Sequence, residues 1–158
     1  MTNPEVTTGR IPWPPVIYLI ALIAAIALQS AYPLPWLLGL LAELLLVIGG
    51  IVVLAAIALW ITAFRAMKAA RTTLNPRGVP EKLLTGGAFA ISRNPIYLAN
   101  TLLLIGIGLF VGSVWFILAA FLAAFATQKL AIEHEEKVLA GRFGKRFHDY
   151  AKRVRRWI

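Results

Sequence analysis

The most constraining feature of this chain is a set of long apolar runs, the longest of which extends from Trp36 to Phe64. A helix of about 20 apolar residues crosses the hydrocarbon core of a bilayer and satisfies its own backbone hydrogen bonds there. Of the 158 residues, 59% are hydrophobic and 15% are charged, which leaves too little polar surface for a soluble domain of this size. The sequence therefore predicts an all-α, polytopic, integral membrane protein.

The apolar runs predict about four membrane-spanning helices, at residues 16–31, 36–64, 95–110 and 114–130. The first is short enough to need Trp13 and Tyr32 as interfacial anchors, and the second is longer than a bilayer requires. The neighbouring glycines Gly49 and Gly50 would let another helix approach the second span closely. Pro95 suits the first position of the third helix, where a backbone N–H has no helical partner.

The chain should form a single domain, residues 1–158, with two N-terminal spans in residues 16–64 and a functional half in residues 71–158. From Ala131 onward we expect a charged, amphipathic C-terminal helix that is broken at Gly141 and Gly144. The chain has no cysteine, which excludes disulfides and thiolate chemistry.

The net charge of +9 is unevenly placed. Lysine and arginine concentrate in a central segment, residues 65–93, and in the tail, residues 129–156, whereas the connections at residues 32–35 and 111–113 carry no charge. By the positive-inside rule, the central segment and both termini are predicted to be cytoplasmic. Anionic lipid headgroups are the expected partner of the basic tail, and the mean hydropathy of +0.76 argues against a nucleic-acid partner.

Two polar segments adjoin the third and fourth predicted spans. The first, Gly86–Leu98, runs directly into the third span, and the second, Glu133–Glu136, follows the fourth. Because these two spans form a helical hairpin, we expect the two polar segments to face each other at the membrane surface. Together they are the candidate site.

The acidic segment also has a purely structural interpretation. Glu133 lies four residues from both Lys129 and Lys137, which is the spacing of ion pairs on a solvated helix. A metal site built from Glu133, His134 and Glu136 is not predicted, because the chain has two histidines and no ligands at a recognisable metal-binding spacing. The residues alone leave a structural and a functional role for these carboxylates open.

Arg93-Asn94-Pro95 marks the start of a helix at the membrane surface, with Asn94 in the N-cap position and Arg93 among the headgroups. The free N–H groups and the positive end of such a helix suit a carboxylate or a phosphate. Tyr97 lies one turn further on, where tyrosines are common at interfaces. The turn at Gly86 and Gly87 matches neither a Rossmann nor a phosphate-loop pattern, since no strand precedes it.

Two other polar residues have simpler explanations. Glu43 lies inside the second span near its outer end, where an ionisable group is costly, and snorkelling towards the outer headgroups accounts for it without a function. Ser92 does not support a hydrolase, because the chain has neither a histidine within sequence reach nor a nucleophile-elbow pattern.

Taken together, the second half of the chain resembles the integral-membrane methyltransferases typified by isoprenylcysteine carboxyl methyltransferase and the phospholipid N-methyltransferases. The matching pieces are Leu83–Phe89, Ser92–Leu98, Glu133–Glu136 and Phe143–Tyr150. The resemblance extends from about Arg71 to the C-terminus. Each piece alone is weakly specific, but their order and spacing around a helical hairpin are fairly specific.

The resemblance implies S-adenosyl-L-methionine as the cofactor, bound on the cytoplasmic side without a Rossmann domain. It assigns cofactor contacts to the following residues: Glu81, Leu83, Leu84, Phe89, Arg93, Asn94, Pro95, Ile96, Tyr97, Glu133, Glu135 and Glu136. Glu133 and Lys129 are the catalytic candidates, with Glu133 holding a cofactor hydroxyl or ammonium group and Lys129 near the acceptor.

The chain departs from the usual family pattern at several positions. Asn94 replaces a histidine, Ala99 a glycine and Phe147 a tyrosine. Lys129 stands where the carboxyl methyltransferases have an arginine, so bidentate recognition of a carboxylate is lost. This substitution argues against carboxyl methylation of a prenylated protein.

The predicted function is methyl transfer from S-adenosyl-L-methionine to a lipophilic acceptor at the cytoplasmic membrane surface. The acceptor is a phospholipid amine, or a lipid-like carboxylate, thiol or amine. One alternative is an NADPH-dependent membrane reductase of the steroid 5α-reductase type, which would bind NADPH preferentially. Another is a non-catalytic lipid-binding membrane protein, which would bind no nucleotide-type ligand and would tolerate mutation of Tyr97 or Glu133.

Overall fold

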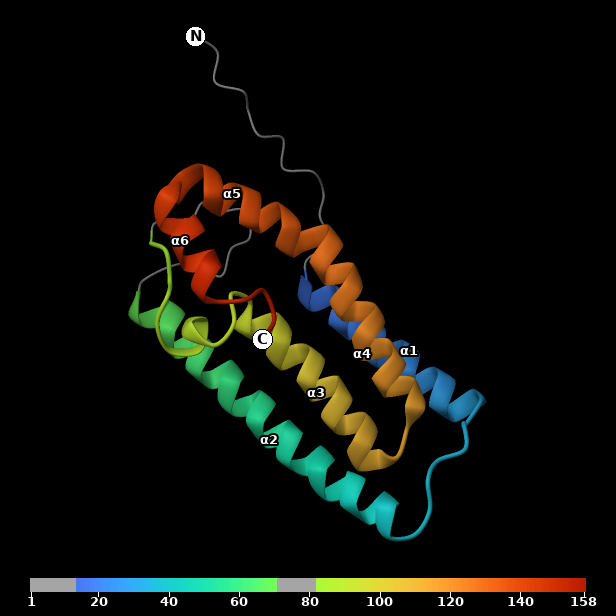
Figure 1. The fold of residues 1–158 in the computed structure, drawn as a ribbon. Helices are drawn as coiled ribbons and strands as arrows, with labels where there is room; N and C mark the ends of the chain where they lie inside the picture. The colour runs from blue at the N-terminus through green and yellow to red at the C-terminus, as the bar shows by residue number, and fades with distance from the viewer. Residues whose placement is uncertain (1–13, 71–81) are drawn as a thin grey trace.

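A computed structural model describes residues 14–70 and 82–158, and within these residues the chain is all-helical (Figure 1). The elements are α1 (Pro14–Ala31), α2 (Leu40–Ala69), the 3-10 turn η1 (Gly87–Ala90), α3 (Pro95–Val111), α4 (Val114–Thr127), the π-helical segment η2 (Gln128–Ile132), α5 (Glu133–Phe143) and α6 (Lys145–Arg153). The predicted all-α fold is confirmed. Trp13 and Glu81 lie outside the described residues.

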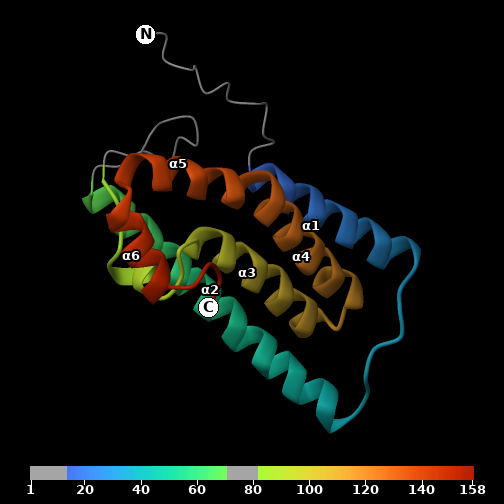
Figure 2. The same cartoon turned by 45° about the horizontal axis from the view of Figure 1, so that its top comes forward.

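The four long helices pack side by side in the order α2, α3, α4, α1, so that α1 and α2 lie at opposite edges (Figures 1 and 2). Residues 32–39 connect these two edges across one end of the bundle. At that end the Ser113 hydroxyl donates a hydrogen bond to the Gln29 side chain at 2.6 Å, and the Trp115 indole donates to the Tyr32 carbonyl at 2.7 Å. These bonds tie the end of α1 to the α3–α4 turn.

Helix α2 approaches α3 most closely at two glycines. A Cβ atom on Gly49 would lie 2.5 Å from the backbone nitrogen of Phe110 and 2.7 Å from the carbonyl oxygen of Gly106. A Cβ on Gly106 would lie 2.9 Å from the backbone nitrogen of Val53. The predicted close approach is therefore made by Gly49, whereas a Cβ on Gly50 would be in ordinary contact with the Phe110 ring at 3.8 Å.

The second helix begins at Leu40, not at Trp36, and continues to Ala69. The chain before it passes through Gly39, whose φ of +70° favours glycine. Trp36 packs instead on Gly112, where an added Cβ would lie 2.8 Å from its Cδ1 atom. Glu43 is exposed in the first turn of α2, where a negative charge interacts favourably with the positive helix end.

Segments α4, η2 and α5 form one continuous helix, Val114–Phe143. The predicted break at Gly141 is wrong, because a single glycine in a helix costs only about 1 kcal/mol relative to alanine. The break occurs at Gly144, whose φ of +50° reverses the chain into α6. Both α5 and α6 lie at the same end of the bundle as the entrance of α3 (Figure 1).

Helix α6 is amphipathic, as predicted for the C-terminal helix. Its buried side consists of Phe147 and Tyr150, which cluster with Val154 and pack against Leu83 and Phe143. Its other side carries His148 and exposed charged side chains: Lys145, Arg146, Asp149, Lys152 and Arg153.

Within residues 14–70 and 82–158, three helices are long and apolar enough to cross a membrane: α1, α2 and the continuous helix Val114–Phe143. Helix α3 is apolar but has 17 residues, which corresponds to about 25 Å at the usual helical rise. Many large apolar side chains of α1, α2 and α4 are exposed, such as Ile20, Leu54 and Leu122. Lipid, not water, is the solvent that such surfaces require, so the chain is an integral membrane protein.

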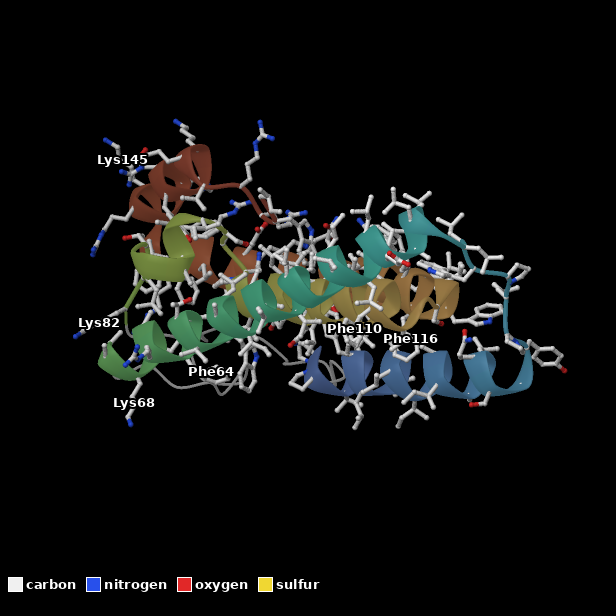
Figure 3. All side chains as sticks on the ribbon, turned by 90° about the horizontal axis from the view of Figure 1, so that it is seen from below. Phe64, Lys68, Lys82, Phe110, Phe116 and Lys145 are labelled. Carbon is white, nitrogen blue, oxygen red and sulfur yellow. The ribbon has the colours of Figure 1, made fainter. Side chains whose placement is uncertain are left out.

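Charged side chains gather at the end of the bundle that contains α6. Figure 3 shows Lys68, Lys82 and Lys145 at this end and Phe110 and Phe116 further along the bundle. The start of α1 is also at this end, because the Tyr18 hydroxyl lies 3.2 Å from the backbone carbonyl of Tyr97 in the first turn of α3. The side of the membrane that this end faces stays a prediction, as does the division of the chain into domains.

Candidate functional site

The entrance of α3 is a tight turn that ends at Pro95, which occupies the start of the helix as predicted and is fully buried. Asn94 occupies the N-cap position, but its side chain makes no capping hydrogen bond. Its amide nitrogen donates to the Arg156 carbonyl at 3.2 Å, and the Ser92 hydroxyl accepts the Asn94 backbone N–H at 3.1 Å. The predicted N-cap position of Asn94 is therefore confirmed, but its side chain bonds to the C-terminal segment and does not cap the helix.

Tyr97 and Glu135 connect the two polar segments. The Tyr97 hydroxyl donates a hydrogen bond of 2.7 Å to Glu135 Oε1, which joins the first turn of α3 to the first turn of α5. On the membrane side, the backbone carbonyl of Tyr97 accepts hydrogen bonds from the hydroxyls of Thr101 at 2.9 Å and Tyr18 at 3.2 Å. Helix α1 thus helps to hold Tyr97 in place from the membrane side.

Glu136 is held by two arginines. Arg156 binds it with two hydrogen bonds, from Nε to Oε1 at 3.1 Å and from Nη2 to Oε2 at 2.6 Å. Arg93 contributes a third contact, from Nη2 to Oε1 at 3.1 Å. The Glu136 side chain is only 16% exposed, so these charge-assisted bonds are shielded from water. The Arg93 guanidinium also lies over the Phe147 ring, 5.9 Å from its centroid.

The last residues of the chain fold back across the entrance of α3. We call Val154–Trp157 the C-terminal strap. The Arg155 carbonyl accepts the Arg93 backbone N–H at 3.0 Å, and the Arg156 carbonyl accepts the buried Ser92 hydroxyl at 3.1 Å. The Trp157 indole donates to the Gln128 side chain in η2 at 2.8 Å.

Glu133 pairs with Lys129 at 2.8 Å, and the two side chains are 34% and 52% exposed. This is the four-residue ion pair that the structural interpretation of the acidic segment predicts. The hydrogen bond from Lys129 lowers the pKa of Glu133. Among the described residues, no three His, Asp or Glu side chains are grouped as metal ligands would be.

Glu135 has the opposite electrostatic environment. Burial raises the pKa of Glu135 because it disfavours the charged carboxylate, and the hydrogen bond from Tyr97 offsets only part of this effect. Neighbouring glutamates on one helix thus differ. Glu133 is solvated and paired with Lys129, Glu135 is half-buried and bonded to Tyr97, and Glu136 is bound by arginines.

The remaining predicted site residues surround the α3 entrance. The Phe89 carbonyl in η1 accepts the Tyr150 hydroxyl at 2.6 Å, and burial raises the pKa of Tyr150 to about 12. Leu83 packs against the α6 cluster, and Leu84 and Ile96 are half-buried. Glu81, the other predicted residue, lies outside the described residues.

Sequence reasoning did not identify four residues at this site: Tyr18, Gln128, Arg156 and Trp157. The sequence presents Arg156 only as one of the basic residues of the tail, which are predicted to contact lipid headgroups. Its position in a run of arginines carried no signal that distinguishes it from its neighbours. Only the fold of the strap brings it to Glu136.

A family model described as Phospholipid methyltransferase matches residues 44–146, well over half of the chain. The chain belongs to the phospholipid methyltransferase family. The resemblance predicted from the sequence is thereby confirmed. The matched residues include Tyr97, Glu135 and Glu136, whereas α1 and the C-terminal strap lie outside them.

Membership of the phospholipid methyltransferase family makes the chain a membrane methyltransferase. It does not favour the membrane reductase or the non-catalytic lipid-binding protein that the sequence left open. No curated protein and no solved structure matches the chain.

Proposed function

We propose that this membrane methyltransferase transfers a methyl group from S-adenosyl-L-methionine to a lipophilic acceptor at the cytoplasmic surface of the membrane. The observation that carries the proposal is the 2.7 Å hydrogen bond between Tyr97 and Glu135, which lies within the family-matched residues. It joins two polar segments at the ends of apolar helices. A site in this position can receive a polar cofactor from water and an apolar acceptor from lipid.

The polar groups at the α3 entrance fit the chemistry of this cofactor. Glu135 offers a carboxylate that can accept hydrogen bonds from ribose hydroxyls or pair with an ammonium group. Arg93 has a buried Nε atom with no hydrogen-bond partner among the described residues, which suits the carboxylate of the cofactor. A Cβ atom on Gly86 or Gly87 would meet nothing within 4 Å, so there is room beside this turn.

We therefore assign Tyr97 and Glu135 as the principal cofactor contacts, with Glu133 as the second carboxylate candidate. The assignment also includes residues around the turn: Leu83, Leu84, Phe89, Arg93, Asn94, Pro95 and Ile96. Glu136 is less suited to hold the cofactor, because both of its oxygens are already bound by arginines. When bound, S-adenosyl-L-methionine supplies a methyl group on a positively charged sulfur, already activated for transfer. The protein then mainly has to orient the acceptor.

The family supports a phospholipid amine as the acceptor. An amine is protonated at neutral pH and has to lose a proton before it can accept a methyl group. Glu135 is suited to take this proton, because burial raises the pKa of its carboxyl group and so makes the carboxylate a stronger base. A carboxylate or thiolate acceptor would need no base, and the exposed ammonium group of Lys129 would stabilise its charge.

The charge distribution supports a cytoplasmic site. The exposed basic residues of α6 lie at the same end of the bundle as the α3 entrance, and the positive-inside rule favours the cytoplasm for this end. The same exposed residues would attract anionic lipid headgroups. The acceptor would then reach the site from the cytoplasmic leaflet.

Calorimetric titration of the detergent-purified protein with S-adenosylhomocysteine tests the proposal, with NADPH titrated in parallel. We expect saturable binding of S-adenosylhomocysteine alone. Tyr97→Phe and Glu135→Gln should each weaken it about tenfold or more, as expected for a hydrogen bond to a charged group. Lys145→Gln, which changes an exposed charge on α6, is the matched control and should bind like the wild type.

Each outcome has a distinct meaning. If the folded wild-type protein bound neither ligand, the proposed function would be wrong. Preferential binding of NADPH would favour the reductase. If both site variants bound S-adenosylhomocysteine with wild-type affinity, the cofactor assignment would stand, but the assignment of Tyr97 and Glu135 as its contacts would be wrong.

A further inference from the structure

The entrance of α3 obtains its hydrogen-bond partners from residues 62 to 64 positions later in the chain. The Arg155 and Arg156 carbonyls accept bonds from the Arg93 backbone, the Ser92 hydroxyl and the Asn94 amide. Ser92 is fully buried, so water cannot replace the strap as its partner while the fold is intact. The strap therefore forms an essential part of the turn before Pro95.

The strap is itself anchored at two points on the continuous helix Val114–Phe143. Arg156 forms a bidentate pair with Glu136 in α5, and the Trp157 indole donates to Gln128 in η2. These anchors hold the strap on the same helix that carries Glu135, the partner of Tyr97. The start of α3 is thus linked to α5 by two routes, directly through Tyr97 and indirectly through the strap.

The two arginines of the strap have different surroundings. The Arg156 side chain is 31% exposed and directed at Glu136, whereas the Arg155 side chain is exposed. A tail that served only to contact lipid headgroups would leave both arginines in solvent. The commitment of Arg156 to an internal carboxylate indicates a role within the protein.

We propose that the C-terminal strap positions the entrance of α3, and that Arg156 is a positioning residue that acts through Glu136. This proposal extends the proposed function, and its test by ligand affinity rests on that function. Without the strap, the Ser92 hydroxyl, the Arg93 backbone N–H and the Asn94 side-chain amide lose these acceptors. Tyr97 would then no longer be held opposite Glu135.

Hydrogen exchange and ligand affinity together test this proposal. In Arg156→Gln, and in a chain that ends at Arg153, we expect amide exchange of residues 92–94 to increase about tenfold or more. We expect the affinity for S-adenosylhomocysteine to fall by a similar factor. Arg156→Lys should recover part of both losses, because an ammonium group restores the charge but not the bidentate geometry.

Lys152→Gln is the matched control, since it removes one positive charge from an exposed side chain of α6. It should leave both measurements at their wild-type values. Unchanged exchange of residues 92–94 in Arg156→Gln and in the shortened chain would overturn the proposal. So would faster exchange combined with wild-type affinity for S-adenosylhomocysteine. The exchange measurement needs no ligand, so it tests the strap even if the wild-type protein fails to bind S-adenosylhomocysteine and the proposed function falls.

Discussion

The crossing of α2 and α3 allows a sharp test of the packing, because the neighbouring glycines Gly49 and Gly50 have different surroundings. A methyl group added at Gly49 would lie 2.5 Å from the backbone nitrogen of Phe110 and 2.7 Å from the carbonyl oxygen of Gly106. A methyl group added at Gly50 would lie 3.8 Å from the Phe110 ring, which is an ordinary van der Waals distance. We therefore expect Gly49→Ala to destabilise the protein and Gly50→Ala to be tolerated.

The size of the effect follows from the distances. Backbone atoms cannot rotate away, and ordinary contact begins at 3.4 Å, so α2 has to move by about 1 Å from α3. Overpacking of this kind costs about 1–3 kcal/mol. For a chain of this length, 1 kcal/mol lowers the Tm by about 2–4 °C. Gly50→Ala carries no such cost, and alanine favours the helix by up to about 1 kcal/mol.

Thermal unfolding in detergent, followed by circular dichroism, measures both variants against the wild type. The expected order of Tm is Gly49→Ala below the wild type and Gly50→Ala at or above it. Equal Tm values for the two variants would refute the close approach of α2 and α3 at Gly49. The paired design controls for the general effect of replacing a glycine in this helix.

Three further predictions concern the polar end of the bundle. Burial raises the pKa of Glu135 in the folded protein, so its stabilising contribution is present at acid pH and is lost as the pH rises through that pKa. The Tm of Glu135→Gln relative to that of the wild type should therefore increase as the pH rises. A difference in Tm that does not depend on pH would contradict this. Tyr150 should ionise at about pH 12 in an ultraviolet titration, and the stability of the protein should fall as the pH rises from 10 to 12. Tyr150→Phe should lower the free energy of unfolding by about 1 kcal/mol, because it removes the 2.6 Å hydrogen bond to the Phe89 carbonyl. Tags on both termini should resist external protease in sealed cells, and cleavage of either tag would exclude a cytoplasmic location for that terminus.

The sequence alone determined the class of fold. Apolar runs of this length are stable in lipid as helices, so the approximate positions of the apolar helices followed from hydropathy. Four spans were predicted, and among the described residues three helices are long enough to cross a membrane, whereas α3 is shorter. Although only the packing decided that Gly49 makes the close approach, local chemistry marked the pair Gly49-Gly50 for it and also set the start of α3 at Pro95. These features depend on neighbouring residues and on the solvent, which is why they could be predicted without knowledge of the packing.

The direction of each glutamate could not be predicted in the same way. Four-residue spacing relates Glu133 to Lys129, and that pair does form. The site, however, depends on which glutamate meets α3, and that depends on η2, where five residues form a π-helical turn. A π turn changes the register of everything that follows it, so helical periodicity through Gln128–Ile132 cannot tell which of Glu133, Glu135 and Glu136 faces Tyr97.

In the basic tail, too, some features follow from the sequence and others only from the tertiary structure. Its composition determined that the chain end is positively charged and carries an amphipathic helix, because periodicity and charge are local properties. Only the tertiary structure decided that Arg156 leaves the basic surface for Glu136 and that two carbonyls of the strap complete the turn at Ser92 and Arg93. Backbone acceptors are the same in every residue, so the sequence carries no mark of which carbonyl a distant donor uses, and the packing of α6 makes that choice.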